Sequence, residues 1–426
     1  MRNSLRKNLW LVLVFFLISV AVFLWLPYAR FSTMRQFFLS LGQASSLVGY
    51  CLYMINFILS SRSKWLDNLF FGLNRTYLKH HLLGTSAFLL LLLHPIFIIL
   101  SYLTVSIDSA LFYVLPSIKN FPTLFGSVAL LFTIILLVIT LYVKIEYSRW
   151  KITHKFLGLG LLFATLHIMF IGSTLSLSLP LKIYFYLLAF AAFMSYIRWT
   201  LLGKFFMKKV SYRVFDVIKI GEHIRLILKP GKEKLEYYPG QFVFVEFPGK
   251  RILSESHPFS IASSPDASYI ELGIKAVGTY TNKLASLNKD DKVLLDGPYG
   301  RFSYKYYRNK SLVWIAGGIG VVPFVAMAKN MPNNIKTTLF YSVKNPSEAF
   351  YLKELIEISK QNRNFQLILW ESSKRGRFGA RDIPNILPEN GYFICGPEAM
   401  MKSLFKQLLS EGVPDRNIHT EEFSLM

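Results

Sequence analysis

Six long apolar stretches fill the first half of this 426-residue chain, and they constrain its fold more than any other feature. They occupy residues 9–28, 39–60, 78–103, 122–143, 153–173 and 181–202. A helix needs roughly 20 apolar residues to cross a bilayer, and each stretch has about that length. The second half is far more polar, so we expect a membrane domain followed by a soluble part. The sequence therefore predicts a six-helix transmembrane bundle at residues 1–207.

The chain is strongly basic, with a formal net charge of +23, which is also typical of nucleic-acid-binding proteins. Here the basic residues gather at the ends of the apolar stretches, so we expect a lipid bilayer and no nucleic acid as partner. One set of connecting loops carries Lys64, Arg75, Lys79, Arg149, Lys151 and Lys155. The opposite loops carry only Arg30, Arg35, Lys119 and Lys182. The positive-inside bias predicts an integral inner or plasma membrane protein whose N-terminus and soluble half are cytoplasmic.

Four histidines lie towards the ends of two of the apolar stretches. His80 (or its neighbour His81) and His94 belong to the third stretch, and His154 and His167 belong to the fifth. An unpaired imidazole is costly in lipid. The two stretches run in the same direction, so the histidines would pair at two levels, roughly 20 Å apart at about 1.5 Å per residue. Such pairs can clamp one haem near each membrane surface, and the sequence predicts two bis-histidine haems.

Either of two adjacent histidines could be the inner ligand of the third stretch. His80 precedes His94 by 14 residues, which places the two within about 40° on one helical face, whereas His81 would point about 140° away. We therefore favour His80, although the second pair has a spacing of 13 and does not exclude His81. Gly84 and Gly158 would let a macrocycle approach the backbone, or would let helices pack closely.

The pattern of the second half changes to short alternating segments from about Val210. The runs SYRVFDVIKI, HIRLILK and QFVFVEF predict an antiparallel barrel at residues 208–307. HPFSIASSP, ELGIKAVGTYT and DGPYG follow in that order. LVWIAGGIGVVPF is typical of a buried strand, a glycine turn and a helix start, a place that favours a phosphate. With FICGPEAM further on, it predicts an α/β nucleotide-binding domain at residues 308–426.

These motifs, with six spans and paired histidines before them, resemble the ferric reductase/NADPH oxidase superfamily. The fold expected is thus a multidomain membrane protein, with a helical bundle, an FAD-binding β-barrel and an NADPH-binding α/β domain. The resemblance implies FAD, two b-type haems and NADPH as cofactors. It implies an oxidoreductase that reduces O2 to superoxide on the outer face, or alternatively a ferric-chelate reductase. The haem ligands it implies are His80, His94, His154 and His167.

The same resemblance assigns roles to residues of the soluble half. The FAD-binding residues it implies are His257, Pro258, Phe259, Ser260, Ile274, Lys275, Gly278 and Thr281. The dinucleotide residues it implies are Gly317, Gly318, Gly320, Cys395, Gly396 and Pro397. Cys395 is expected to face the nicotinamide, and Phe423 is expected to cover the flavin, which makes them the two catalytic positions.

The strand TTLFYSVKN ends without an acidic residue that could accept a ribose 2′-hydroxyl. Ser342 and Lys344 instead suit a 2′-phosphate, and Arg375 or Arg377 are further candidates. We therefore expect NADPH rather than NADH as the electron donor.

The composition of the outer loops, near 101–121 and 172–181, indicates which electron acceptor to expect. These loops contain no dense acidic or metal-ligand cluster, which favours oxygen over a ferric chelate. Two other classes compete: a haem-binding subunit that serves a partner reductase, and a transporter. The intact flavin and nucleotide motifs argue against the first, and histidines in two layers rather than around one cavity argue against the second. No segment requires a protein partner.

Overall fold

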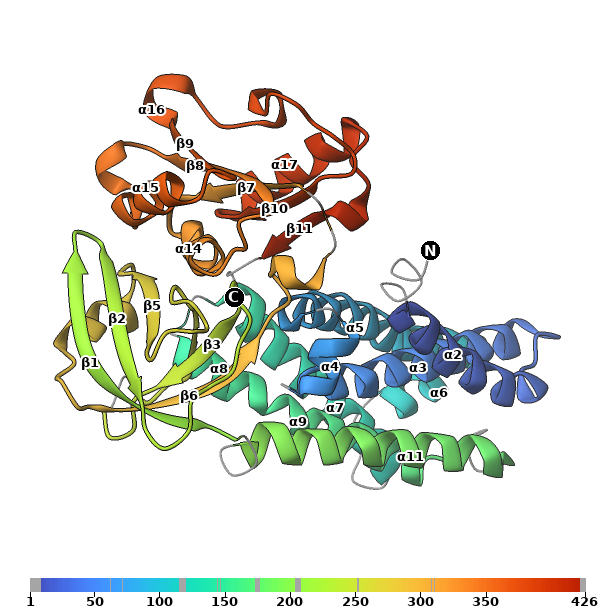
Figure 1. Ribbon diagram of the computed structural model, residues 1–426. Coiled ribbons are helices and arrows are strands. Elements are labelled where there is room, and N and C mark those ends of the chain that lie inside the picture. Colours follow the sequence, from blue (N-terminus) through green and yellow to red (C-terminus); the bar gives the residue numbers. More distant parts are fainter. Residues whose placement is uncertain are drawn as a thin grey trace.

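The computed structural model describes residues 9–421 except 62, 71, 115–119, 144, 146, 173–176, 204–207, 251–252, 308 and 310. Lys119 and Phe423, named above, lie outside the described residues. Figure 1 shows a helical bundle, a six-stranded sheet at one end of it, and a five-stranded α/β domain above that sheet. The order along the chain is therefore the order expected from the sequence, and the fold class is confirmed.

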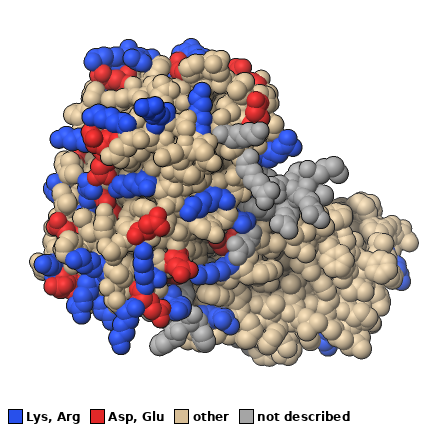
Figure 2. Space-filling view, in the orientation of Figure 1, with Lys and Arg blue, Asp and Glu red and all other residues tan. Residues whose placement is uncertain are grey.

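The bundle contains six segments, among the residues described, that are long and apolar enough to span a membrane. Its main helices are α2 (Leu9–Trp25), α3 (Met34–Leu59), α5 (Leu73–Leu103), α7 (Phe121–Tyr142), α9 (Leu157–Phe170) and α11 (Leu179–Ser195). A helix satisfies its backbone polar groups internally, as lipid requires. Figure 2 shows this part of the molecule almost without charged side chains, in contrast to the soluble half. The protein is an integral membrane protein.

Helix α3 forms the centre of the bundle. In its most apolar 18-residue stretch, 61% is buried inside the protein, whereas the corresponding share in the other spans is 28% or less. It packs against α5, and the short helix α4 (Lys64–Leu69) lies between them in the chain; α6 (Ile107–Val114) lies between α5 and α7. The remaining spans leave leucine and phenylalanine side chains on the outside, as expected of surfaces that face lipid.

The fifth span, Arg149–Phe170, is confirmed as long and apolar enough to cross a membrane, but a break at Phe156 divides it into two helices. Helix α8 (Tyr147–Lys155) ends before Phe156, and α9 begins after it. The amides of Phe156 and Leu159 bond to carbonyls three residues back, at 3.1 and 2.9 Å, which tightens the chain locally. His154 and His167 therefore lie on separate helices, and an ideal helical phase does not apply to their spacing.

The first soluble domain is an antiparallel sheet in the order β4-β3-β6-β1-β2-β5. Its strands are β1 (Val210–Ile220), β2 (His223–Pro230), β3 (Phe242–Glu246), β4 (His257–Ser260), β5 (Ile270–Lys275) and β6 (Lys292–Tyr299). A bridge between Ile261 and Leu272 joins the end of β4 to β5, so the sheet closes on itself. Alternating apolar side chains of the strands fill its interior.

The second soluble domain is a parallel sheet in the order β11-β10-β7-β8-β9. Its strands are β7 (Ser311–Gly317), β8 (Lys336–Val343), β9 (Phe365–Glu371), β10 (Gly391–Cys395) and β11 (Ile418–Glu421). The crossover helices include α14 (Val322–Lys329), α15 (Leu352–Gln361) and α17 (Glu398–Ser410). Both faces of β7 and β10 are covered, so these central strands are almost wholly apolar.

Candidate functional site

Two pairs of histidines face each other between α5 and the α8–α9 segment. The ring centres of His80 and His154 lie 6.1 Å apart, and those of His94 and His167 lie 6.3 Å apart. His81 has an exposed side chain and lies beside His80 rather than opposite His154. The structure therefore brings together the four histidines that the sequence analysis favoured, in the two pairs it expected.

Each pair has the separation that one metal ion between two imidazoles requires. A metal–imidazole bond is about 2 Å long, so two nitrogens on opposite sides of an ion lie about 4 Å apart and the ring centres about 6 Å apart. Among the described residues, no group of three or more histidine, cysteine or acidic side chains could hold a metal ion. A donor set of two imidazoles fits a metal whose other ligands come from a macrocycle, as in a haem.

Backbone carbonyls orient three of the four rings. The Nδ1–H groups of His80, His94 and His167 donate to the carbonyl oxygens of Asn56, Gly42 and Pro122, at 3.2, 2.8 and 2.6 Å. Because a carbonyl only accepts, Nδ1 carries the proton in these rings. Their Nε2 lone pairs are left for an axial ligand bond, the usual arrangement around a metal-bound histidine.

His154 is held differently from the other three. Its Nδ1 is buried and has no hydrogen-bond partner among the described residues. The ring stacks on Trp150, with 5.1 Å between ring centres and 14° between planes. The ring orientation at this position therefore rests on an aromatic contact within α8.

The glycines of the bundle serve helix packing. A Cβ on Gly84 would lie 2.7 Å from the side-chain nitrogen of Asn56, and one on Gly158 would overlap the ring of Tyr196. Both positions were considered for approach of a macrocycle, but each faces a neighbouring helix. Gly126 lets α7 approach the His167 ring, because a Cβ there would lie 2.8 Å from Nδ1. Glycine at these crossings allows close helix contact in a membrane.

The expected flavin strand, β4, pairs antiparallel with β3, which places Ser260 opposite Phe242. Ser260 is buried, whereas Pro258 and Phe259 are half-buried. The ring of His257 lies 3.8 Å from that of Tyr280, between ring centres, and its Nε2 lies 3.3 Å from Glu255. The ring contact joins β4 to the short helix that follows the turn of the second FAD motif.

That turn precedes a short helix, α13 (Thr279–Lys283). The hydroxyl of Thr281 accepts hydrogen bonds from the amides of Val277 and Gly278, both at 3.0 Å, and so shapes the turn. Ile274 packs inside the barrel and does not present its side chain at the surface. Lys275, the next residue, instead points into the cleft that the second soluble domain forms.

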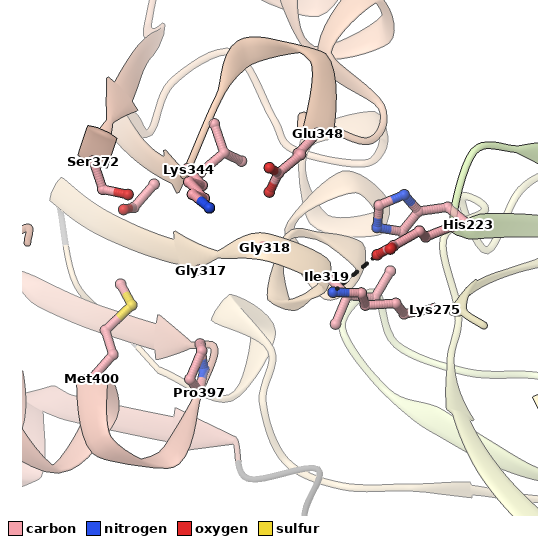
Figure 3. Close-up of a pocket in the computed structure, with 13 residues that line it drawn as sticks. His223, Lys275, Gly317, Gly318, Ile319, Lys344, Glu348, Ser372, Pro397 and Met400 are labelled. Atoms are coloured by element: carbon pink, nitrogen blue, oxygen red, sulfur yellow. Dashed lines mark ion pairs between the residues drawn. The ribbon is translucent and has the colours of Figure 1, made fainter. Parts of the chain in front are cut away.

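A cavity of about 240 Å³ lies between the two soluble domains, and Figure 3 shows its walls. Gly317, Gly318, Ser342, Lys344 and Pro397 line it, as a dinucleotide site would require. They come from the ends of β7, β8 and β10, the edge of a parallel sheet at which ligands bind. Gly318 has a φ of +53°, a conformation that glycine adopts readily.

Two turns interlock behind this cavity. A Cβ on Gly320 would lie 2.3 Å from the carbonyl oxygen of Cys395, and one on Gly396 would lie 3.0 Å from Gly317. Cys395 is fully buried in the domain core, and burial raises the pKa of its thiol well above the ordinary value, as does nearby Glu421. Gly320 is thus needed for the close packing of these two turns as well as for the approach of a dinucleotide.

The first soluble domain adds residues to this cavity that the sequence analysis did not select. His223, to which the sequence analysis assigned no role, lines the cavity together with Lys275, its cross-strand neighbour, and stacks on Phe350 at 4.6 Å between ring centres. Burial lowers the pKa of His223, and Lys275 lowers it further. The strand pairing with Lys275 was the only available signal for this residue.

The structure also differs from the sequence analysis at a few other residues of the soluble half. Ser372 lies on its wall, whereas Arg375 does not and instead lies over the ring of Trp370, 5.2 Å from its centre. Arg377 is exposed and does not line the cavity either. Tyr280, beneath His257, is a further residue that sequence reasoning did not single out.

Comparison with known families divides the chain in the same way as the structure. Residues 45–165 match a ferric reductase like transmembrane component, 206–303 an FAD-binding domain, and 314–406 an oxidoreductase NAD-binding domain. The first match includes His80, His94 and His154 and ends just before His167; the second covers the barrel, and the third covers most of the second soluble domain.

Each of three curated relatives matches less than half of this chain. A superoxide-generating NADPH oxidase heavy chain of Dictyostelium discoideum is 24% identical over 240 residues, 41% of this chain and 46% of its own length. A probable dihydroorotate dehydrogenase B electron transfer subunit of Pyrococcus furiosus is 34% identical over 188 residues, 42% of this chain and 68% of its own length. A flavohemoprotein of D. discoideum is matched over 56% of its length, so the chain spans about half to two thirds of these relatives.

One solved structure aligns with nearly the whole chain. A flavohemoglobin from Malassezia yamatoensis, with bound FAD and heme, has a TM-score of 0.53 and 15% identity, covering 96% of this chain and 99% of its own. The similarity concerns the fold alone.

Proposed function

Because the chain belongs to the ferric reductase and NADPH oxidase superfamily of membrane flavoprotein oxidoreductases, we propose that it moves electrons from cytoplasmic NADPH to an acceptor outside. The path we propose runs through FAD and two b-type haems held by the histidine pairs. The observation that carries this proposal is the 6.1 and 6.3 Å separation of the two ring pairs, with Nδ1 protons directed to carbonyls. When bound, these cofactors supply hydride acceptance and single-electron transfer.

In this proposal, residues of the membrane half hold the haems and orient the histidine rings that bind them. His80 and His154 would hold the inner haem, and His94 and His167 the outer one. Because two imidazoles would hold each iron, the haems would supply single-electron transfer to an acceptor that does not bind the metal. The carbonyls of α3 and α7 fix the planes of three rings and thereby limit how far each ligand can rotate.

The residues of the soluble half bind and align the dinucleotide. Gly317 and Gly318 would let its phosphates approach the end of β7, and Ser342 with Lys344 would bind the 2′-phosphate of NADPH. The turn at Cys395–Pro397 would face the nicotinamide through its backbone, since the thiol is buried. We assign Phe423 to the flavin face, as its family position implies.

Basic residues at one end of the bundle indicate how the protein is oriented in the membrane. Arg75 and Lys79 lie at the end of α5 nearest the soluble domains, where His80 lies, and Lys155 ends α8. The positive-inside rule then supports a cytoplasmic position for both soluble domains. The second histidine pair would lie close to the outer surface.

We favour oxygen as acceptor, with superoxide as product. The outer loops lack a dense acidic or metal-ligand cluster in the sequence, and one relative of this chain is named as a superoxide-generating NADPH oxidase. A ferric chelate is the second candidate, because the matching transmembrane component is described as ferric reductase like.

A spectrum of the purified full-length protein, followed by addition of NADPH, tests the proposal. We expect a six-coordinate haem spectrum, haem reduction by NADPH, and reduction of cytochrome c that superoxide dismutase abolishes. Rapid turnover of an Fe(III) chelate without superoxide would instead favour the second candidate. Protein purified without haem or flavin under conditions that retain both in a related oxidase would contradict the proposed electron path.

A further inference from the structure

The break between α8 and α9 takes the usual hydrogen-bond donor away from one backbone carbonyl. In an unbroken α-helix the amide of Leu159 would bond to the carbonyl of Lys155, four residues back. Here that amide bonds instead to the carbonyl of Phe156, at 2.9 Å. The Lys155 carbonyl therefore needs another donor, because a buried backbone group without a partner is costly, above all in a membrane span.

A tyrosine hydroxyl supplies that donor. The O–H of Tyr196 donates to the carbonyl of Lys155 at 2.7 Å. A π-helical turn, η2 (Tyr196–Leu201), begins at this tyrosine where α11 ends, and such turns are frequent at functional positions. The ring lies against Gly158, at which a Cβ would overlap it. Glycine at position 158 thus gives the tyrosine ring the room to reach the break.

A second tyrosine contacts the other side of the break. The hydroxyl of Tyr53, in α3, donates to the carbonyl of Leu157 at 3.2 Å, and a Cβ on Gly160 would lie 3.1 Å from that hydroxyl. The ring centre of Phe57 lies 5.1 Å from that of Tyr53 and 5.7 Å from that of Tyr196. The three rings form a row, so the central helix α3 and the end of α11 hold the break together.

The carbonyl that Tyr196 binds belongs to the residue directly after His154. Unlike the other three histidines, His154 has no hydrogen-bond partner for its Nδ1 among the described residues. Its ring stacks on Trp150 of the same helix, α8, so ring and helix are oriented together. The placement of α8 at the break therefore decides how His154 faces His80, with 66° between the ring planes.

We infer that Tyr196 is a positioning residue for His154, and that it thereby tunes the reduction potential of the inner haem. It acts through the Lys155 carbonyl, by holding the break in the geometry that aims the His154 ring at His80. Groups that orient a metal ligand also tune the metal. Tyr53 supports the same break from α3. The inference rests on the proposed function, because it assumes that this histidine pair holds a haem.

The test compares Tyr196→Phe with Tyr184→Phe as a matched control. Tyr184 lies earlier on α11, and its hydroxyl also donates to a carbonyl of the bundle, that of Leu17, at 2.8 Å. Phenylalanine keeps the ring at both positions and removes only the hydroxyl. Both haems of the full-length protein are followed by electron paramagnetic resonance and by a spectroscopic redox titration. The variant His94→Ala, which keeps the inner pair, assigns the signals.

For Tyr196→Phe we expect two haem equivalents, with a changed low-spin signal and a shifted midpoint potential at the inner haem alone. The signal should change because it depends on the angle between the two imidazole planes. Tyr184→Phe should match the wild type at both haems. Tyr53→Phe is a second variant for the same break, and it should alter the inner haem and leave the outer one unchanged.

A further readout does not depend on haem redox chemistry. Amide hydrogen exchange at Leu159, in the break, should become faster in Tyr196→Phe and stay slow in Tyr184→Phe.

Wild-type signals and potentials at the inner haem in both Tyr196→Phe and Tyr53→Phe would overturn the inference and leave the proposed function standing. Equal changes at the two haems would also overturn it, because a general loss of bundle packing would explain that result. Absence of two low-spin haem signals from the wild-type protein would instead overturn the proposed function.

Discussion

The interface between the two soluble domains contains a buried ionic cluster around Glu271 of β5. Glu271 is fully buried, and its Oε1 lies 2.6 Å from Nε of Arg225 and 2.7 Å from the hydroxyl of Tyr351. Lys329 of α14 lies 3.6 Å from its other oxygen. Glu354 of α15 completes the cluster, 2.6 Å from Arg225 and 3.0 Å from Lys329. The Glu271 carboxylate therefore joins the barrel directly to Tyr351 and to α14 of the nucleotide-binding domain.

Removing this carboxylate should destabilise the soluble half strongly. Loss of one partner from a buried ion pair costs about 3–5 kcal/mol, because the remaining charge stays buried. Arg225 and Lys329 stay paired with Glu354, and they keep 24% and 21% of their side-chain surface exposed, so their charges remain partly compensated. We therefore expect about 3 kcal/mol for Glu271→Ala, at the lower end of that range. Glu271→Gln keeps the hydrogen bonds without the charge and should cost about 1–2 kcal/mol.

The assay is urea unfolding of the full-length protein, followed by release of flavin fluorescence. With a slope of roughly 2–3 kcal/mol per M, the midpoint for Glu271→Ala should fall by about 1 M or more. Glu357→Gln is the control, since Glu357 lies on the same helix α15 in an exposed pair with Lys360 at 2.9 Å. Such a pair contributes about 0.5 kcal/mol or less. A midpoint for Glu271→Ala no lower than that of the control would refute the reasoning.

Four further outcomes are expected. His94→Ala should lose the outer of two haems while NADPH still reduces the flavin, and two retained haem equivalents would contradict the ligand assignment. Lys344→Ala should raise the KM for NADPH about tenfold more than that for NADH, because a charged hydrogen bond to the 2′-phosphate is lost; equal effects on both would exclude that role. Burial and then Lys275 lower the pKa of His223 below its ordinary 6.5, so the ring is neutral at pH 7. Protonation beside a bound phosphate should therefore lower the KM for NADPH as the pH falls below about 6.5, and His223→Gln should abolish that trend. The Cys395 thiol, whose pKa burial raises well above the ordinary value, should resist alkylation at pH 8 until the protein is denatured.

Features that depend on local pattern were predictable. Each membrane span follows from the length of an apolar stretch, and the pairing of His80 with His154 follows from helical phase and a common direction. The glycine turn at Gly317 and Gly318 likewise follows from a strand pattern that meets a helix start. The ligand and cofactor roles of these residues stay predictions, while the residues themselves lie where the patterns indicated.

Features that depend on distant neighbours were not predictable. Whether Gly84 faces a macrocycle or Asn56 is decided by how α3 crosses α5, and no local pattern encodes that crossing. The same holds for His223, which lines the cavity only because the second soluble domain packs over the start of β2.

The amino-acid sequence by itself determined the six spans, the order of the three domains and the residue types available at each cofactor position, because hydrophobic length and backbone period act over a few neighbouring residues. Only the tertiary structure decided which partners those residues meet, such as Glu271 with Lys329 and Gly158 with Tyr196. Such pairs bring together segments far apart in the chain. Their energies depend on burial and on donor and acceptor geometry, which arise only when the domains pack against one another.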